Sequence, residues 1–271
     1  MTGAVRRVMA LLGKELAELR RNASALLPVL FLAGVTVTLP FIIVVVVPRA
    51  IGEPLSADAD FARLATRTGS PEEVALLSRN GAIQAFLFQQ FLMVQLLIPV
   101  AGAMSFAGYS LIGEKQVRSL EPLLATPLRT AELIVAKGLG ALVPSLAILL
   151  CASAVYFAGI AFWAEPGVFR VLLNPRSAAV LLALAPATSL VALQVGVLVS
   201  SRAKDPRTAQ QFSAFLILPL TALFAVQFSG AMTLTVPLVL LMALVLLTIW
   251  VLLVLIAVAL FNREAILTRW Q

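Results

Sequence analysis

The sequence predicts an all-α integral membrane protein, in which six transmembrane helices follow an N-terminal amphipathic interfacial helix. Composition is the first reason, because 61% of the 271 residues are hydrophobic and 12% are charged, whereas a soluble domain has about 25% charged residues. The second reason is that long segments carry no charge at all. The third is that the apolar runs are continuous rather than alternating, which favours helices over β-strands in lipid.

The first predicted element is an amphipathic helix at residues 4–21. Its apolar side chains recur at helical spacing and its charges occupy the remaining surface. These apolar residues are Val5, Val8, Met9, Leu12, Leu16 and Leu19. We expect this helix to lie in the membrane interface before the chain enters the bilayer; the alternative is that it packs on protein. The apolar run is too short, and too soon followed by charges, for a signal peptide.

The uncharged segments mark the membrane spans. About 20 apolar residues suffice to cross a bilayer, so each of the first four uncharged segments fits one span. The last, residues 208–262, would be about 80 Å long as a single helix, and polar residues interrupt it near 227–237. We therefore divide it into two spans. The six predicted spans are 25–47, 83–112, 138–163, 177–200, 209–228 and 237–261.

The distribution of Lys and Arg predicts the orientation of a single transmembrane domain at residues 1–271. Six spans place both termini on one side, together with a loop at 113–137. Fourteen of the 20 Lys and Arg residues lie on that side, and six lie on the side of the outer loop at 48–82. Since basic loops stay inside, we expect a multi-pass protein of the plasma (inner) membrane with both termini cytoplasmic. The net charge of +7 then reports topology, and we expect no nucleic acid partner.

The missing residue types argue against several functions. The chain has no His and a single Cys, Cys151, so a His-ligated metal site and an intrachain disulfide are excluded. It has no phosphate-binding loop of the G-x-x-x-x-G-K-[ST] type. No charged residue lies deep in a predicted span, which argues against proton-coupled carriers, polar ion channels and membrane hydrolases. We expect a non-catalytic chain without a cofactor or metal of its own.

Amides are the most prominent polar groups within the predicted spans. Gln84, Gln90, Gln95 and Gln194 are candidates for lining a pathway. The alternative for each is an interhelical hydrogen bond.

The loop at 113–137 carries most of the remaining specific chemistry. It contains two helix starts with proline near the first position, at Glu121-Pro122 and Thr126-Pro127. An apolar row of four leucines accompanies them, at Leu120, Leu123, Leu124 and Leu128. Such a row either contacts a protein partner or packs against the helix ends of the same chain.

Three segments together resemble the ABC-2 type transporter permeases. Glu114-Lys115, then SLEPLLATPL at 119–128, then Glu132-Leu133 and Lys137 match the signature loop of that family in residue type and spacing. Lys14-Glu15-Leu16 through Arg21 resembles its opening helix. Residues 200–211 resemble the second cytoplasmic turn of a branch that includes sodium- and drug-export permeases. One departure is Arg118, where many members have Gly.

The resemblance implies a half-transporter. Two permease chains, the same or homologous, would form the pathway and dock on a pair of cytoplasmic ABC ATPase subunits that bind ATP and Mg²⁺. Membrane lipids would surround the spans. In this family the link between spans five and six often re-enters the membrane from outside, and the polar interruption at 227–237 is compatible with that. The expected substrate is an amphipathic drug, lipid or lipid-linked compound. The alternative function is a nucleotide-independent secondary carrier or channel. The implied ATPase-coupling residues are Glu114, Arg118, Leu120, Glu121, Pro122, Leu123, Leu124, Pro127, Arg129, Arg202, Lys204 and Asp205.

Overall fold

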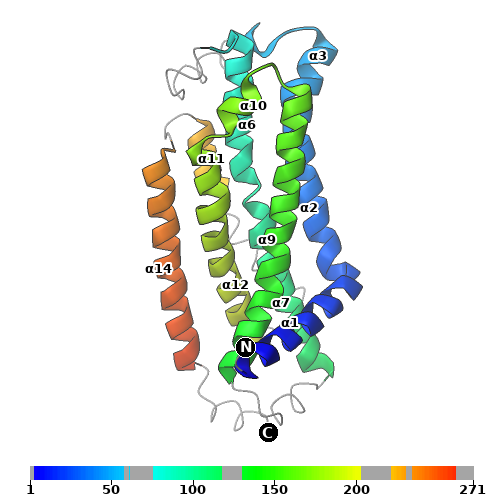
Figure 1. Cartoon of the computed structure of the whole chain (residues 1–271), viewed down its shortest axis with the longest axis vertical. Helices are drawn as coiled ribbons and strands as arrows, with labels where there is room; N and C mark the ends of the chain where they lie inside the picture. The colour runs from blue at the N-terminus through cyan, green and yellow to red at the C-terminus, as the bar shows by residue number, and fades with distance from the viewer. Residues whose placement is uncertain are drawn as a thin grey trace.

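The structure, a computed structural model, describes residues 3–57, 61, 76–117, 130–202, 221–229 and 234–260. Long helices run side by side along one axis and form a bundle (Figure 1). In the described part of the chain there is no β-strand. Five helical segments there are long and apolar enough to cross a membrane, and they overlap five of the six predicted spans. These segments are Ala23–Ile51, Arg79–Tyr109, Val135–Trp163, Pro175–Ser200 and Val236–Ala257.

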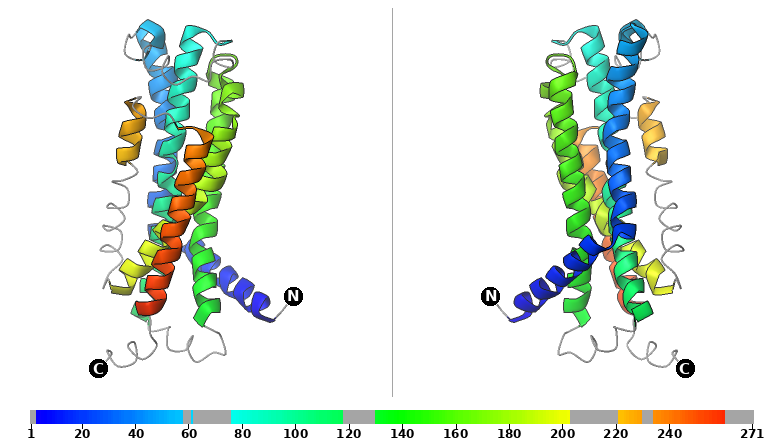
Figure 2. Two further views of the ribbon diagram at one scale, coloured as in Figure 1. Left: turned by 90° about the vertical axis from the view of Figure 1, so that its left-hand side faces the viewer. Right: turned by 90° about the vertical axis from the view of Figure 1, so that its right-hand side faces the viewer.

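Helix α1 (Gly3–Arg21) comes before the first of these segments. It leaves the bundle at a steep angle, with its N-terminal end outermost (Figure 2). The break after it is set by Asn22, whose Oδ1 accepts the Ala25 N–H at 3.2 Å and caps α2 (Ala23–Phe41). A helix is therefore present over the range predicted at 4–21, and its amphipathic, interfacial character stays a prediction.

Two π-helical segments interrupt the spans, and each ends two residues before a proline. Segment η1 (Ile42–Val46) precedes Pro48 in α3 (Val47–Ile51). Segment η3 (Val180–Leu184) joins α11 (Pro175–Ala179) to α12 (Ala185–Arg202) and precedes Pro186. A proline lacks an N–H, and its ring clashes with the carbonyl four residues earlier. The wider π turn gives that carbonyl room.

The second predicted span is broken in the middle. Helix α6 (Arg79–Val94) ends before Gln95, and α7 (Leu97–Val117) begins two residues before Pro99. The carbonyl that Pro99 would otherwise bond in an α-helix is that of Gln95, so the break lies where the proline ring displaces the chain. Turn-type bonds replace the helical ones there: the Leu96 N–H donates to the Met93 carbonyl at 3.1 Å.

The helices extend further into the loop predicted at 113–137 than the charges suggested. We expected a loop at 113–137, but α7 continues to Val117 and α9 (Thr130–Trp163) begins at Thr130. Charged residues mark where a helix leaves lipid, and they do not end the helix itself. At the outer side, likewise, α3 continues to Ile51, the short helix η2 follows at Leu55–Ala57, and α6 begins at Arg79, within the loop predicted at 48–82.

The last two predicted spans differ in how much of them the structure describes. Helix α14 (Val236–Leu260) overlaps the span predicted at 237–261. Of the span predicted at 209–228, residues 221–228 are helical and residues 209–220 lie outside the described part. The count of six spans therefore stays a prediction. The short helix α10 (Val168–Leu172) follows α9 at the outer end.

Glycines let the helices approach closely, as is usual for helices in membranes. A Cβ built on Gly102 in α7 would lie 2.8 Å from Ser145 Cβ in α9. One on Gly196 in α12 would lie 3.2 Å from Met104 Cα in α7, and one on Gly159 in α9 would lie 2.6 Å from the Phe41 ring in α2. At Gly102 and Gly196 the neighbouring backbone is within 3.3 Å of the built Cβ, whereas at Gly159 the close neighbour is a side chain.

Candidate functional sites

One end of the bundle gathers the elements that the sequence assigns to the cytoplasmic side. The ends of α7, α12 and α14, the start of α9, and α1 lie together there (Figures 1 and 2). The opposite end holds α3, α10 and the start of α6. The structure thus brings the residues before and after segment 118–129 to the same end as α1. Which end faces the cytoplasm stays a prediction from the basic residues.

Most of the predicted ATPase-coupling residues lie outside the described part of the chain. Glu114 belongs to the last turns of α7 and Arg202 is the last residue of α12, so both mark helix ends beside the coupling segments. The structure describes the backbone of these two and not their side chains. The residues outside the description are Arg118, Leu120, Glu121, Pro122, Leu123, Leu124, Pro127, Arg129, Lys204 and Asp205.

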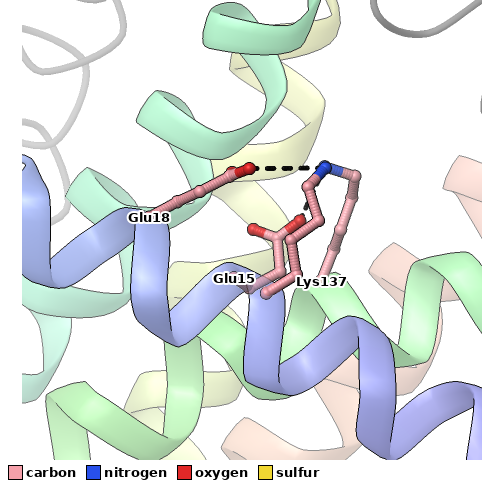
Figure 3. Close-up of polar contacts among 4 residues, drawn as sticks. Glu15, Glu18 and Lys137 are labelled. Atoms are coloured by element: carbon pink, nitrogen blue, oxygen red, sulfur yellow. Dashed lines mark hydrogen bonds and ion pairs between the residues drawn. The ribbon is translucent and has the colours of Figure 1, made fainter.

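A buried ion pair stands at the junction of α1 with α9. The Lys137 Nζ lies 3.3 Å from Glu15 Oε1, and about a tenth of each side chain is exposed. Figure 3 shows the Lys137 side chain reaching from α9 to the Glu15 carboxylate on α1. The sequence placed Glu15 in the opening-helix motif and Lys137 at the end of the signature loop. Nothing in the sequence predicted that the two side chains touch.

The predicted pathway glutamines lie mainly on α6, which is buried on nearly all sides. Gln84 accepts the Glu165 N–H at 2.9 Å through its Oε1. The Gln90 Nε2 donates to the backbone carbonyl of Gln227 at 3.2 Å, and the Gln90 Oε1 accepts a hydrogen bond from the side-chain Nε2 of Gln227. Gln95, in the break after α6, is fully buried, and its Oε1 accepts the Ser153 hydroxyl at 2.6 Å. Gln90 and Gln95 therefore bond other helical segments, and Gln84 bonds the connection between α9 and α10.

Gln89 and Gln227 are two buried amides that the candidate set omitted. Gln89 Oε1 accepts hydrogen bonds from Asn174 Nδ2 at 3.1 Å and from the Ser177 hydroxyl at 3.2 Å. Its partners are about 85 residues away in sequence, so no local pattern could have identified the contact. Gln194, the fourth predicted pathway glutamine, is half-buried and lies on α12 rather than on α6.

Several of these amides are only partly satisfied. Among the described residues, Gln89 Nε2, Gln95 Nε2 and Gln227 Oε1 are buried without a hydrogen-bond partner. A buried polar atom without a partner is costly, so each is a place where a water or a polar group of a bound molecule would be stabilised. Gln89 lies on α6, Gln95 in the break after it, and Gln227 in the helical residues 221–228.

A second polar cluster lies at the end of the bundle opposite α1. The Glu165 carboxylate accepts hydrogen bonds from the Ser78 hydroxyl and, at 2.5 Å, from Asn80 Nδ2. The Ser78 hydroxyl in turn caps α6 by accepting the Gly81 N–H at 2.8 Å. The cluster ties the start of α6 to the end of α9, which is a structural role. No group of three or more His, Cys, Asp or Glu side chains in the described ranges could hold a metal ion.

Comparison with known proteins gives one match. The sequence model of a family described as "ABC-2 family transporter protein" matches residues 9–240. No curated protein matches the chain, and no solved structure matches it. The matched range runs from α1 into the start of α14 and includes the α1–α9 junction and all of α6.

Proposed function

Since this chain belongs to the ABC-2 family of transporter proteins, we propose that it is the permease subunit of an ATP-driven exporter. The observation that carries the proposal is the family match over residues 9–240 together with five helices able to cross a membrane. The chain is thus a multi-pass membrane component of a transporter. That it exports, and that ATP drives it, belong to the proposal.

We further propose that two such chains form the translocation pathway, each docked on a cytoplasmic ABC ATPase subunit. The ATPase pair would bind ATP and Mg²⁺, since no phosphate-binding loop occurs in these 271 residues. Segment 118–129 would be the main contact with the ATPase and the turn around Asp205 a smaller one. In support, the segment joins two long helices, α7 and α9, that cross the bundle and pack on each other.

The half-satisfied amides on and around α6 support a substrate with both polar and apolar parts. Gln89, Gln95 and Gln227 offer one free donor or acceptor each, and the surrounding helices are apolar. We propose an amphipathic drug, a lipid or a lipid-linked compound. A secondary carrier or channel that works without nucleotide is the alternative, and the absence of charged residues deep in the spans argues against it.

The test of this proposal is assembly with an ATPase. Leu124→Ala removes an apolar anchor from segment 118–129, and Glu121→Lys reverses a charge there. Truncated interface anchors often cost about 2 kcal/mol, or roughly thirtyfold in affinity. We expect both variants to insert normally and to copurify far less ATPase than the unaltered chain. Leu76→Ala is the control, because Leu76 is 89% exposed at the outer end and should leave assembly unchanged. Full assembly in both loop variants contradicts the proposal.

A further inference from the structure

The α1–α9 junction differs from an ordinary surface ion pair. Glu15 and Lys137 are separated by 3.3 Å and are 10% and 11% exposed, respectively. On the same helix, Lys14 and Glu18 are separated by 3.4 Å, yet they are 43% and 56% exposed. An exposed pair contributes little. Separating a buried ion pair removes a close counter-charge from each group where water is scarce, which is unfavourable. The buried pair therefore opposes separation of the two helices.

Close backbone packing reinforces the pair. Gly140 lies one turn beyond Lys137 on α9, and a Cβ built on it would be 2.8 Å from Glu15 Cβ. Glu15 Cβ belongs to the root of its side chain and cannot swing away. The α1 helix thus rests directly on the α9 backbone at Gly140 while the charges meet beside it (Figure 3). The backbone packing at Gly140 and the ion pair between Glu15 and Lys137 therefore hold α1 against α9 at the same place.

This contact is close to where the proposed coupling segment enters α9. Helix α9 begins at Thr130, immediately after segment 118–129. Lys137 is seven residues further, or about 10 Å along the helix axis at 1.5 Å per residue. A helix is stiff over that length, so a displacement of its first turn reaches Lys137 undiminished.

We propose that Glu15 and Lys137 are positioning residues that clamp α1 to the first turns of α9, so that these two helices move as one body. In this arrangement, which rests on the proposed function, α1 follows every displacement that the ATPase imposes on the start of α9. Helix α1 runs directly into α2 through Asn22. The clamp therefore gives segment 118–129 a second route into the first span, besides its direct connections to α7 and α9.

The first test measures the clamp itself and needs no ATPase. Spin labels are attached at Met9→Cys on α1 and Val143→Cys on α9, both exposed positions, in a Cys151→Ser background, and labelled chains are diluted with unlabelled ones. We expect one narrow distance distribution. Glu15→Gln, and separately Lys137→Gln, should at least double its width. Glu18→Gln is the matched control on the same helix and should leave the distribution narrow. A broad distribution in the unaltered chain, or no broadening in both clamp variants, overturns the proposal.

The second test asks whether the clamp matters for coupling. In the assembled permease–ATPase complex, Glu15→Gln should retain ATPase association and lower ATP turnover about tenfold. The paired variant Glu15→Cys with Lys137→Cys should be equally slow, and bridging the two thiols with Hg²⁺ should restore turnover. A purely structural role would not be rescued in this way. If bridging leaves turnover low or lowers it further, then α1 and α9 must separate during the cycle and the clamp is wrong. If segment 118–129 binds no ATPase, the proposed function is contradicted. The distance measurement needs no ATPase, so it tests the clamp independently of that function.

Discussion

At the scale of single residues, buried amides and hydroxyls connect the helices of this protein. The Ser153 hydroxyl and Gln95 link α9 to the break between α6 and α7, and both side chains are at least 97% buried. Such bonds within membranes contribute modestly, because the separated helices find other partners. They nevertheless determine which faces meet, since an apolar helix alone has little preference for one face.

Removing the Ser153 hydroxyl tests this role. Ser153→Ala leaves the Gln95 amide without any described partner, and we expect a loss of about 0.6–2 kcal/mol in the free energy of unfolding. The measurement is thermal unfolding of the purified chain in detergent. Thr248→Val is the control, because the Thr248 hydroxyl is exposed and bonds only the Leu244 carbonyl of its own helix. Equal losses in the two variants would show that the Gln95 bond contributes nothing specific.

At the scale of helices, prolines shape the spans and glycines determine how closely the spans pack. Pro48, Pro99 and Pro186 each follow a departure from regular α-helix, two of them π-helical segments and one a break. The break at Gln95 and Leu96 is fully buried, so protein covers its irregular backbone. The two π-helical segments lie at the edge of the bundle, where Ile42, Val46 and Leu182 are exposed. Glycines at the crossings then permit contact between backbones. The packing of α2 on α9 depends on Gly159, which lies against the outer end of the Phe41 ring.

Adding one methyl group at this crossing tests the packing. In Gly159→Ala the new Cβ would lie 2.6 Å from the Phe41 ring, and that ring also packs against Phe88 and Tyr156. We expect a destabilisation of about 1–3 kcal/mol from overpacking, seen as a lower midpoint of thermal unfolding. Gly34→Ala, in α2, meets nothing within 4 Å and should be neutral or gain up to about 1 kcal/mol in helix propensity. A stable Gly159→Ala chain would contradict the packing.

At the scale of the whole molecule, the first four described spans run in alternating directions, and α14 runs in the same direction as α12 (Figure 1). Helix α1 and the ends of α7, α12 and α14 lie at one end of the bundle. The excess of Lys and Arg at that end predicts that it is cytoplasmic. Helix α14 is little covered by the rest of the chain, so lipid or a second chain would surround it in the membrane.

Labelling of single cysteines in intact cells checks the orientation. In a Cys151→Ser background, we expect an impermeant thiol reagent to label Ser56→Cys, which lies in η2 at the outer end, and to spare Ser119→Cys until the membrane is opened. The opposite pattern contradicts the orientation. Gly13→Cys, on α1 with nothing within 4 Å, provides a second cytoplasmic position whose helix the structure describes.

The purified chain allows a test of whether ATP hydrolysis needs the partner ATPase. We expect the purified protein to hydrolyse no ATP, because its sequence has no phosphate-binding loop. Phosphate release is measured before and after the native ATPase is added back, and turnover should appear only with the ATPase present. Hydrolysis that persists through a stringent preparation free of partner chains contradicts this prediction.

The sequence by itself determined the membrane character of the protein, the positions of five spans and the family. These follow from local properties, because uncharged length reports bilayer crossing and the signature from Glu114 to Lys137 is contiguous in the chain. Only the tertiary structure decided which polar groups meet. Glu15 and Lys137 are 122 residues apart, and Gln90 and Gln227 are 137 residues apart. No periodicity records such distances, since a pairing across the bundle depends on how every helix between the two residues is packed.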